Sequence, residues 1–266
     1  MSSILTNTSA LVALQTLKSI NTGMGKVQNE ISTGMRVSTA KENSSSWSIA
    51  STMKSDVGSY KKLSESLTSA SALVGVARSA AEQISDILKQ VQEKVVQALD
   101  PGADTAKIQA DVTALTGTIT SIAQSAQYNG INLVNAAAAS VNVAGSIVRT
   151  AGVLTVQNIA TGAANLEALG AALVVGTATP NDIDTLIDTA NAAAATFGAA
   201  QARIEAQNSF LTKQADALKV GVGALVDADM EEASSRLQAL QVQQQLGVQS
   251  LSIANQAPQS VLALFR

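Results

Sequence analysis

The residue types that most often carry chemistry are scarce in this sequence of 266 residues, which contains no histidine and no cysteine. Their absence excludes Ser-His catalysis, thiol catalysis and metal sites built from imidazole or thiolate ligands. Asp227 and Asp229 are the clearest candidate carboxylate pair, but residues two apart do not share a helix face. We therefore interpret them as part of a solvated charge run. Gly34, Gly221 and Gly223 form no phosphate-binding loop, so we expect no catalytic activity, cofactor or metal.

Composition narrows the class of protein further. The formal net charge is −3, which gives no reason to expect nucleic acid as a partner. No apolar run reaches the length of a membrane span, and the first residues lack the basic and apolar regions of a cleaved signal peptide. Hydrophobic residues make up 46% of the chain but aromatic residues only 2%, a balance that suits closely packed helices.

One long helix organises the predicted structure. From Leu63 onward, apolar residues recur in alternating steps of four and three, the heptad spacing of a helix packed lengthwise against others. These residues are Leu63, Leu67, Ala70, Val74, Ala77, Ala81, Ile84, Leu88, Val91, Val95 and Ala98. At about 1.5 Å per residue, the helix is roughly 50 Å long, so helices from elsewhere must cover its stripe. We expect this helix to begin near Ser45 and to end at Asp100-Pro101-Gly102.

A second helix follows that turn, with the same spacing from Ile108 through Leu115 and Ile119 to Ala126. The short connection predicts an antiparallel helical hairpin. Tyr128-Asn129-Gly130 then closes the second helix with residues that tolerate positive φ.

The stretch after position 135 changes character and is rich in Val, Thr, Ala and Gly. Segments 146–150 and 153–157 flank Ala151-Gly152, which predicts a β-hairpin. Leu166, Leu169 and Leu173 predict a short helical turn after it.

Both ends of the chain are predicted to be helical. Residues 1–40 carry an apolar stripe, with Asn7-Thr8-Ser9 as candidate N-cap and a break at Ser32-Thr33-Gly34. A helix is expected from Thr179-Pro180 to about Asn255, with a bend near Gly221 and Gly223 where the heptad spacing slips. The N-terminal helix is net basic, and the segment after the bend is net acidic in its first turns, with Asp227, Asp229, Glu231 and Glu232, so we expect the two ends to pair.

The predicted fold is therefore mainly α, a long antiparallel bundle or coiled coil formed by both chain ends, with a small insert that contains a β-hairpin. We expect three parts: 1–44 with 222–266, 45–135 with 179–221, and the insert 136–178. The expected bundle core comprises Leu63, Leu67, Val74, Ile84, Leu88, Val91, Val95, Leu115, Ile119, Leu211 and Leu218.

Several motifs, in order at both ends, resemble bacterial flagellin. They are Asn7–Leu11, Ile31–Arg36, Ser38–Asn43, Tyr128–Gly130, Gly198–Arg203, Asp227–Met230 and Asn255–Leu264. The resemblance covers about 1–135 and 181–266 and leaves the middle unmatched, where this family varies most.

The resemblance implies a self-assembling filament subunit that is secreted through the flagellar type III apparatus and works outside the cell. Identical copies, an export chaperone and a cap protein are the implied partners. The terminal helices would form the inner tube and the insert would face outward. The implied inner-tube interface comprises Leu17, Ile20, Met24, Val27, Ile31, Leu237, Leu240, Leu251, Leu262, Leu264 and Phe265.

One departure from the family pattern concerns an innate-immune receptor that senses flagellins through a Q-R-x-R-E-L-type stretch. Here the arginines are replaced by Gln90 and Gln92, and Lys94 follows Glu93 in place of leucine. The bidentate contacts of guanidinium are then unavailable, so we expect weak or no receptor activation.

Two further functions remain as alternatives at this point. A hook–filament junction protein of the flagellum shares the terminal helices, and a secreted coiled-coil effector or adhesin would be monomeric. Filament formation by the purified chain alone distinguishes both from a filament subunit.

Overall fold

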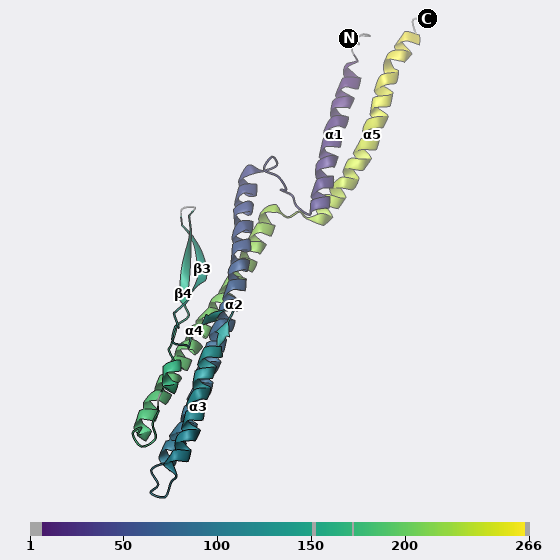
Figure 1. The fold of residues 1–266 in the computed structure, drawn as a ribbon. Coiled ribbons are helices and arrows are strands. Elements are labelled where there is room, and N and C mark those ends of the chain that lie inside the picture. Colours follow the sequence, from purple (N-terminus) through teal and green to yellow (C-terminus); the bar gives the residue numbers. More distant parts are fainter. Residues whose placement is uncertain (1–6, 151–152, 172, 264–266) are drawn as a thin grey trace. The chain divides into compact units, whose positions relative to one another are not determined.

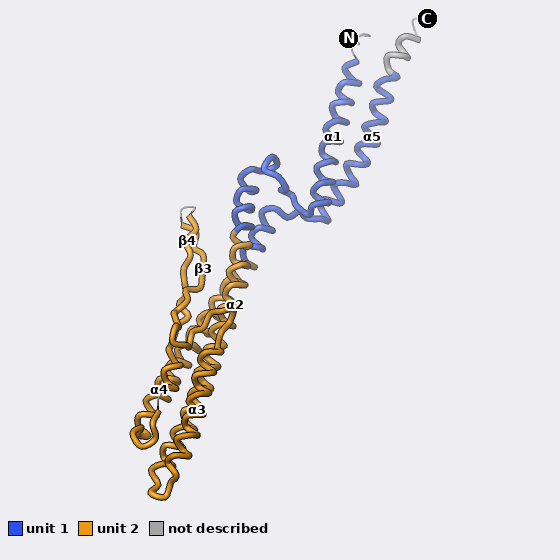
Figure 2. The backbone as a smooth tube through the Cα atoms, in the orientation of Figure 1, with its two compact units in different colours: residues 1–55, 217–266 blue, residues 56–216 orange. Residues whose placement is uncertain are grey.

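The computed structural model describes residues 7–150, 153–171 and 173–263, with side chains described up to Gln256. Five long helices and two small antiparallel hairpins account for most of this part (Figure 1). The prediction of a mainly α fold in which helices from both ends of the chain pair is confirmed. The chain forms two compact units, and their boundaries fall within the helices α2 (Ser44–Gln97) and α4 (Pro180–Val226) (Figure 2).

Unit 1 consists of residues 1–55 and 217–266. Its main feature is the pairing of α1 (Thr8–Thr33) with α5 (Met230–Ala263) (Figure 1). The Asn7 side chain caps α1 by accepting a hydrogen bond from the Ala10 N–H at 3.0 Å, as the sequence predicted. Gly34 ends the helix with φ 69°, a left-handed conformation that suits glycine.

Backbone hydrogen bonds join the segment between α1 and α2 to the break between α4 and α5. The Arg36 N–H donates to the Val226 carbonyl at 2.7 Å, and the Ala228 N–H donates to the Gly34 carbonyl at 3.0 Å. Val37, Val222 and Val226 belong to a small buried apolar cluster in the same unit. The bend expected near Gly221 and Gly223 is therefore a complete helix break, and it falls a few residues later, at 227–229.

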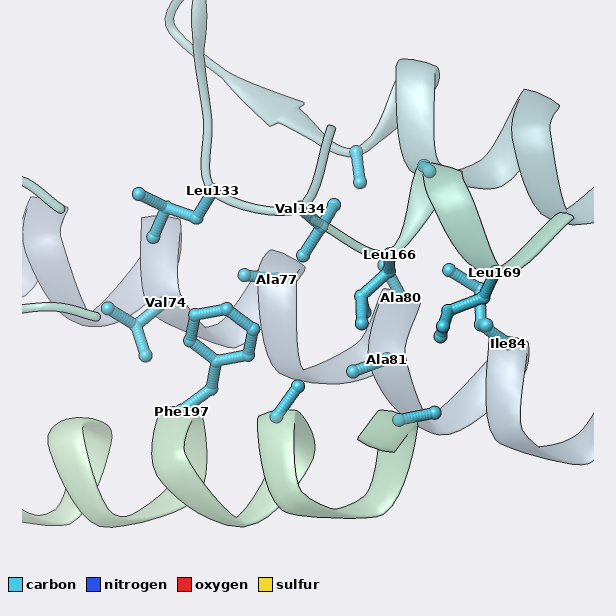
Figure 3. Packing of buried hydrophobic residues seen from close by; sticks show 14 of the residues in the cluster. Val74, Ala77, Ala80, Ala81, Ile84, Leu133, Val134, Leu166, Leu169 and Phe197 are labelled. Atoms are coloured by element: carbon cyan, nitrogen blue, oxygen red, sulfur yellow. The ribbon is translucent and has the colours of Figure 1, made fainter. Parts of the chain in front are cut away.

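Unit 2, residues 56–216, contains the long part of α2, together with α3 (Thr105–Ser125) and most of α4. Its core runs along the α2 seam, where Leu67, Ile84 and Leu88 have no exposed surface. Phe197 of α4 inserts beside Val74 and Ala77 of α2 (Figure 3). The heptad spacing thus identified the covered stripe of α2 correctly.

Side-chain caps mark two helix starts in unit 2. Asp104 caps α3 by accepting from the Lys107 N–H at 3.3 Å. At the start of α4, the Asp182 carboxylate accepts from the Thr179 N–H at 2.9 Å, while the Asp182 N–H donates to the Thr179 hydroxyl at 3.3 Å. This reciprocal capping box confirms the helix start predicted at Thr179-Pro180.

The insert contains the predicted hairpin, and a smaller hairpin that the sequence reasoning missed precedes the insert. Strands β3 (Asn142–Thr150) and β4 (Val153–Ala160) pair antiparallel, with an irregularity between Ala144 and Ser146. The tiny hairpin of β1 (Gln127–Tyr128) and β2 (Ile131–Asn132) turns at Asn129 and Gly130, with φ 51° and 79°. These two residues were expected only to close α3, yet they form the kind of turn that favours a hairpin.

The remaining insert residues pack against α3. A single 3₁₀ turn, η1 (Glu167–Gly170), stands where Leu166, Leu169 and Leu173 predicted a helical turn, although Leu173 lies beyond it. Leu166 and Leu169 point into the core together with Leu133 and Val134 (Figure 3). The insert therefore contributes to the bundle core as well as carrying the hairpin.

Candidate assembly interface

The α1–α5 pair leaves several large apolar side chains exposed. Such side chains are Leu11, Val12 and Leu14 on α1, and Val242, Leu246, Val248 and Ile253 on α5, each more than half exposed. Val242, Leu246 and Ile253 share one face of α5 through their spacing of four and seven, and exposed apolar surface on one face marks an interaction site in a soluble protein.

A groove of about 450 Å³ runs between the two helices beside these residues. Val12 and Leu246 supply its apolar rim, and Ser9, Thr16 and Gln243 supply hydroxyl and amide groups. Gly247 allows α5 to approach Leu17 of α1 closely, because a Cβ at position 247 would lie only 3.1 Å from the Leu17 Cδ1. The groove is thus shaped and chemically suited to hold an apolar side chain or helix ridge.

The predicted inner-tube residues lie on the seam between α1 and α5. Val27 is buried; the half-buried members are Leu17, Ile20, Met24, Ile31, Leu237, Leu240 and Leu251. Leu264 and Phe265 lie outside the described residues, as does the side chain of Leu262. The seam residues therefore hold the two helices of one chain together, and their contact with other copies stays a prediction.

Sequence reasoning missed the exposed apolar residues of α5. Val242, Leu246 and Ile253 are separated by steps of four and seven, a second heptad row beside the first. Such a second row is the signal that could have identified this face.

The predicted core residues of the bundle fall mostly where they were expected. Those that are buried are Leu63, Leu67, Val74, Ile84, Leu88, Val91, Val95, Ile119 and Leu211. Leu115 is half-buried and packs against the same core. Leu218 is half-buried as well, but it belongs to unit 1 and not to this core.

The stretch compared with the receptor motif lies on the outer side of α2. Gln90 and Glu93 are exposed. Gln92 donates to the Asp184 carboxylate at 2.8 Å, and the Lys94 ammonium lies 2.7 Å from Asp111. Two of these three substituted positions, Gln92 and Lys94, are therefore engaged within the chain.

The candidate carboxylate pair has a structural role. Asp229 accepts hydrogen bonds from the N–H groups of Glu231 and Glu232, at 3.0 and 3.2 Å, and so caps α5. Asp227 lies in the helix break, bridged through its backbone to Met35. Among the described residues, no group of three or more acidic side chains could hold a metal ion.

Several carboxylates in the described part of the chain are anchored by hydrogen bonds that lower their pKa. The pKa of Glu42 lies below its usual value because the N–H groups of Thr39 and Ser38 donate to its carboxylate. The pKa of Asp182 is lowered by the Thr179 N–H and hydroxyl, and that of Glu167 by the Gln124 amide and the Ala136 N–H. In each case the hydrogen-bond donors stabilise the charged form of the carboxylate.

No helix among the described residues combines the length and apolarity that a membrane span requires.

Comparison with known proteins gives the family of the chain. The model of the bacterial flagellin N-terminal helical region matches residues 4–139, and that of the bacterial flagellin C-terminal helical region matches residues 181–265. The unmatched residues contain β3, β4 and η1.

Curated relatives match along the whole chain. A flagellin of Brucella melitensis biotype 1 is 40% identical, and flagellin C of Rhizobium meliloti is 37% identical, each over 100% of both chains. Flagellin FljM of Caulobacter vibrioides is 35% identical over 100% of this chain and 99% of its own. The two family models and these full-length relatives show that the chain belongs to the bacterial flagellin family.

Proposed function

We propose that this chain is a structural subunit that assembles with identical copies into the bacterial flagellar filament and supports swimming. The observation that carries the proposal is the exposed apolar face of the α1–α5 pair, in a chain matched to flagellins at both ends. A lone molecule leaves this face in water, whereas a polymer buries it at every subunit.

The proposal extends to location and partners. The subunit is secreted through the flagellar type III apparatus, with an export chaperone and a cap protein as further partners, and it acts outside the cell without catalytic activity. Residues 1–44 with 222–266 form the inner tube, the bundle 45–135 with 179–221 surrounds it, and 136–178 faces outward. Membership of a structural protein family supports this assignment.

The filament subunit is favoured over the hook–filament junction protein because each of the relatives described above is a flagellin. Electron microscopy of the purified chain, with fragmented filaments as seeds, tests this choice. A filament subunit lengthens the seeds without other proteins, whereas a chain that never elongates them contradicts the proposal.

In the monomer, we expect amide hydrogens of α1 and α5 to exchange much faster than those of α2. Most side chains in the α1–α5 seam are only half-buried, and a pair of helices that buries so little apolar surface is only marginally stable in water. Hydrogen exchange followed by mass spectrometry on a verified monomer measures this. Residues 63–98 serve as the internal control, because their seam is covered by unit 2.

Equally strong protection of α1, α5 and the 63–98 segment in that monomer would contradict the idea that assembly completes the folding of the chain ends. In the filament, we expect α1 and α5 to become as protected as α2.

We also expect the purified monomer to activate the flagellin-sensing receptor weakly or not at all, because Gln90 and Gln92 cannot make the paired contacts of arginine. Receptor reporter cells measure this. A Gln90→Arg/Gln92→Arg variant should gain activity, and strong activation by the unmodified chain at low concentration would show that the expectation is wrong.

A further inference from the structure

A hollow of about 240 Å³ in unit 2 combines apolar and polar surface. It lies where α2, the β1–β2 hairpin and the start of β3 meet. Buried apolar side chains, among them Leu73 and Val143, form part of its lining. None of the described residues that line the hollow is a lysine, arginine, aspartate or glutamate. The hollow is therefore electrically neutral.

The β1–β2 hairpin presents two large apolar side chains to this hollow. Tyr128 and Ile131 flank the two-residue turn and are directly opposite each other in the antiparallel register. Opposite residues of an antiparallel pair place their side chains on the same face, and both of these residues line the hollow. Tyr128 is 37% exposed and Ile131 is 38% exposed. An aromatic ring and a branched aliphatic group are thus accessible to a ligand.

The polar side chains of the hollow are available for hydrogen bonding. Ser66 and Ser69 of α2 supply two hydroxyl groups, and Asn129 and Asn142 supply two carboxamides. All four residues are exposed, and none forms a side-chain hydrogen bond with another described residue. By contrast, three other serines of α2 donate hydrogen bonds to side chains of α4, namely Ser64, Ser71 and Ser85. Water occupies the positions around the free groups, and hydroxyl groups of a ligand can replace it.

We propose that this hollow binds one ring of a neutral saccharide. A sugar ring has C–H faces that pack on aromatic and aliphatic side chains, and its hydroxyl groups both donate and accept hydrogen bonds, as serine and asparagine side chains do. A carboxylate or phosphate would lose water without finding an opposite charge in the described lining. Sites for drug-sized ligands measure about 300–1,000 Å³, so this smaller hollow suits a single ring.

Saturation-transfer NMR on the dilute monomer of the whole chain tests the site, with methyl β-D-glucopyranoside as the probe. The expected dissociation constant is about 1 mM, the value that ordinary ligand efficiency gives a molecule of about 13 non-hydrogen atoms. Glucuronic acid at neutral pH is the comparison ligand, because a carboxylate there replaces a neutral group on the same kind of ring. It should bind about tenfold more weakly or worse.

Two variants test the aromatic and the amide parts of the site. Tyr128→Ala removes the stacking surface and should weaken binding of the probe about tenfold, whereas Tyr128→Phe keeps the ring and should stay within about threefold. Asn142→Ala removes one carboxamide and should weaken binding about fivefold. Phe210→Ala is the matched control, because it removes an exposed aromatic ring of unit 2 that does not line the hollow. Circular dichroism verifies that each variant is folded.

The inference is overturned if the probe gives no saturation-transfer signal well above the expected dissociation constant. It is also overturned if folded Tyr128→Ala or Asn142→Ala binds the probe like the unmodified chain, or if Phe210→Ala loses as much affinity as Tyr128→Ala. Glucuronic acid that binds as tightly as the probe would overturn the assignment to a neutral ligand. Binding is measured on the monomer, so its outcome is separate from that of the filament function proposed above.

Discussion

Leu246→Asp should abolish filament growth while leaving the folded monomer intact. Leu246 is 58% exposed on α5 and lines the groove opposite Val12, so the change removes no buried contact within the chain. In a polymer that covers this face, the loss of a buried leucine costs about 1.5–3 kcal/mol and the buried carboxylate adds more. We expect the concentration needed for growth to rise more than about 100-fold.

Sedimentation and electron microscopy of seeded samples measure that concentration, and circular dichroism measures the monomer. Leu246→Met is the matched control: it keeps the volume and apolar character of the side chain and should grow within about tenfold of the unmodified chain. Normal growth of Leu246→Asp would show that the exposed face of α5 is not an assembly interface.

Leu88→Asp should unfold unit 2 itself. Leu88 has no exposed surface and lies in the α2 seam as part of the apolar core. Truncating a buried leucine costs about 2–5 kcal/mol, and an unpaired buried carboxylate adds to that cost. The sum is comparable with the entire stability of a typical domain, about 5–15 kcal/mol.

Thermal unfolding followed by circular dichroism at 222 nm tests this expectation, with Gln90→Asp as the control. Gln90 lies two residues away on the exposed side of the same helix, so its variant should melt within a few degrees of the unmodified chain. A cooperative transition of Leu88→Asp at the normal temperature would mean that this seam does not hold the bundle together.

The two variants separate the two kinds of apolar surface in this protein. The seam of α2 is covered within one chain, whereas the outer face of α5 is covered by nothing in the described part of the chain. Damage to the first should destroy the subunit, and damage to the second should destroy only the polymer.

Local rules in the sequence determined the long helices and several of their ends. Heptad spacing identified the covered stripe of α2, Asn7 and Thr179 were found as caps, and Asp100-Pro101-Gly102 marked the turn before α3. These signals involve residues within one or two turns of each other, so they can be recognised without knowing what packs nearby. The motifs at both ends that resemble flagellin could likewise be recognised in the sequence itself.

Only the tertiary structure decided which apolar rows are covered. Periodicity placed Leu218 in the bundle core and did not single out Leu246, because a heptad row predicts an apolar face without naming its neighbour. The hairpin at Asn129-Gly130 escaped detection because its two-residue strands are too short to show alternation. Burial depends on residues far apart in the chain, and folding alone brings them together.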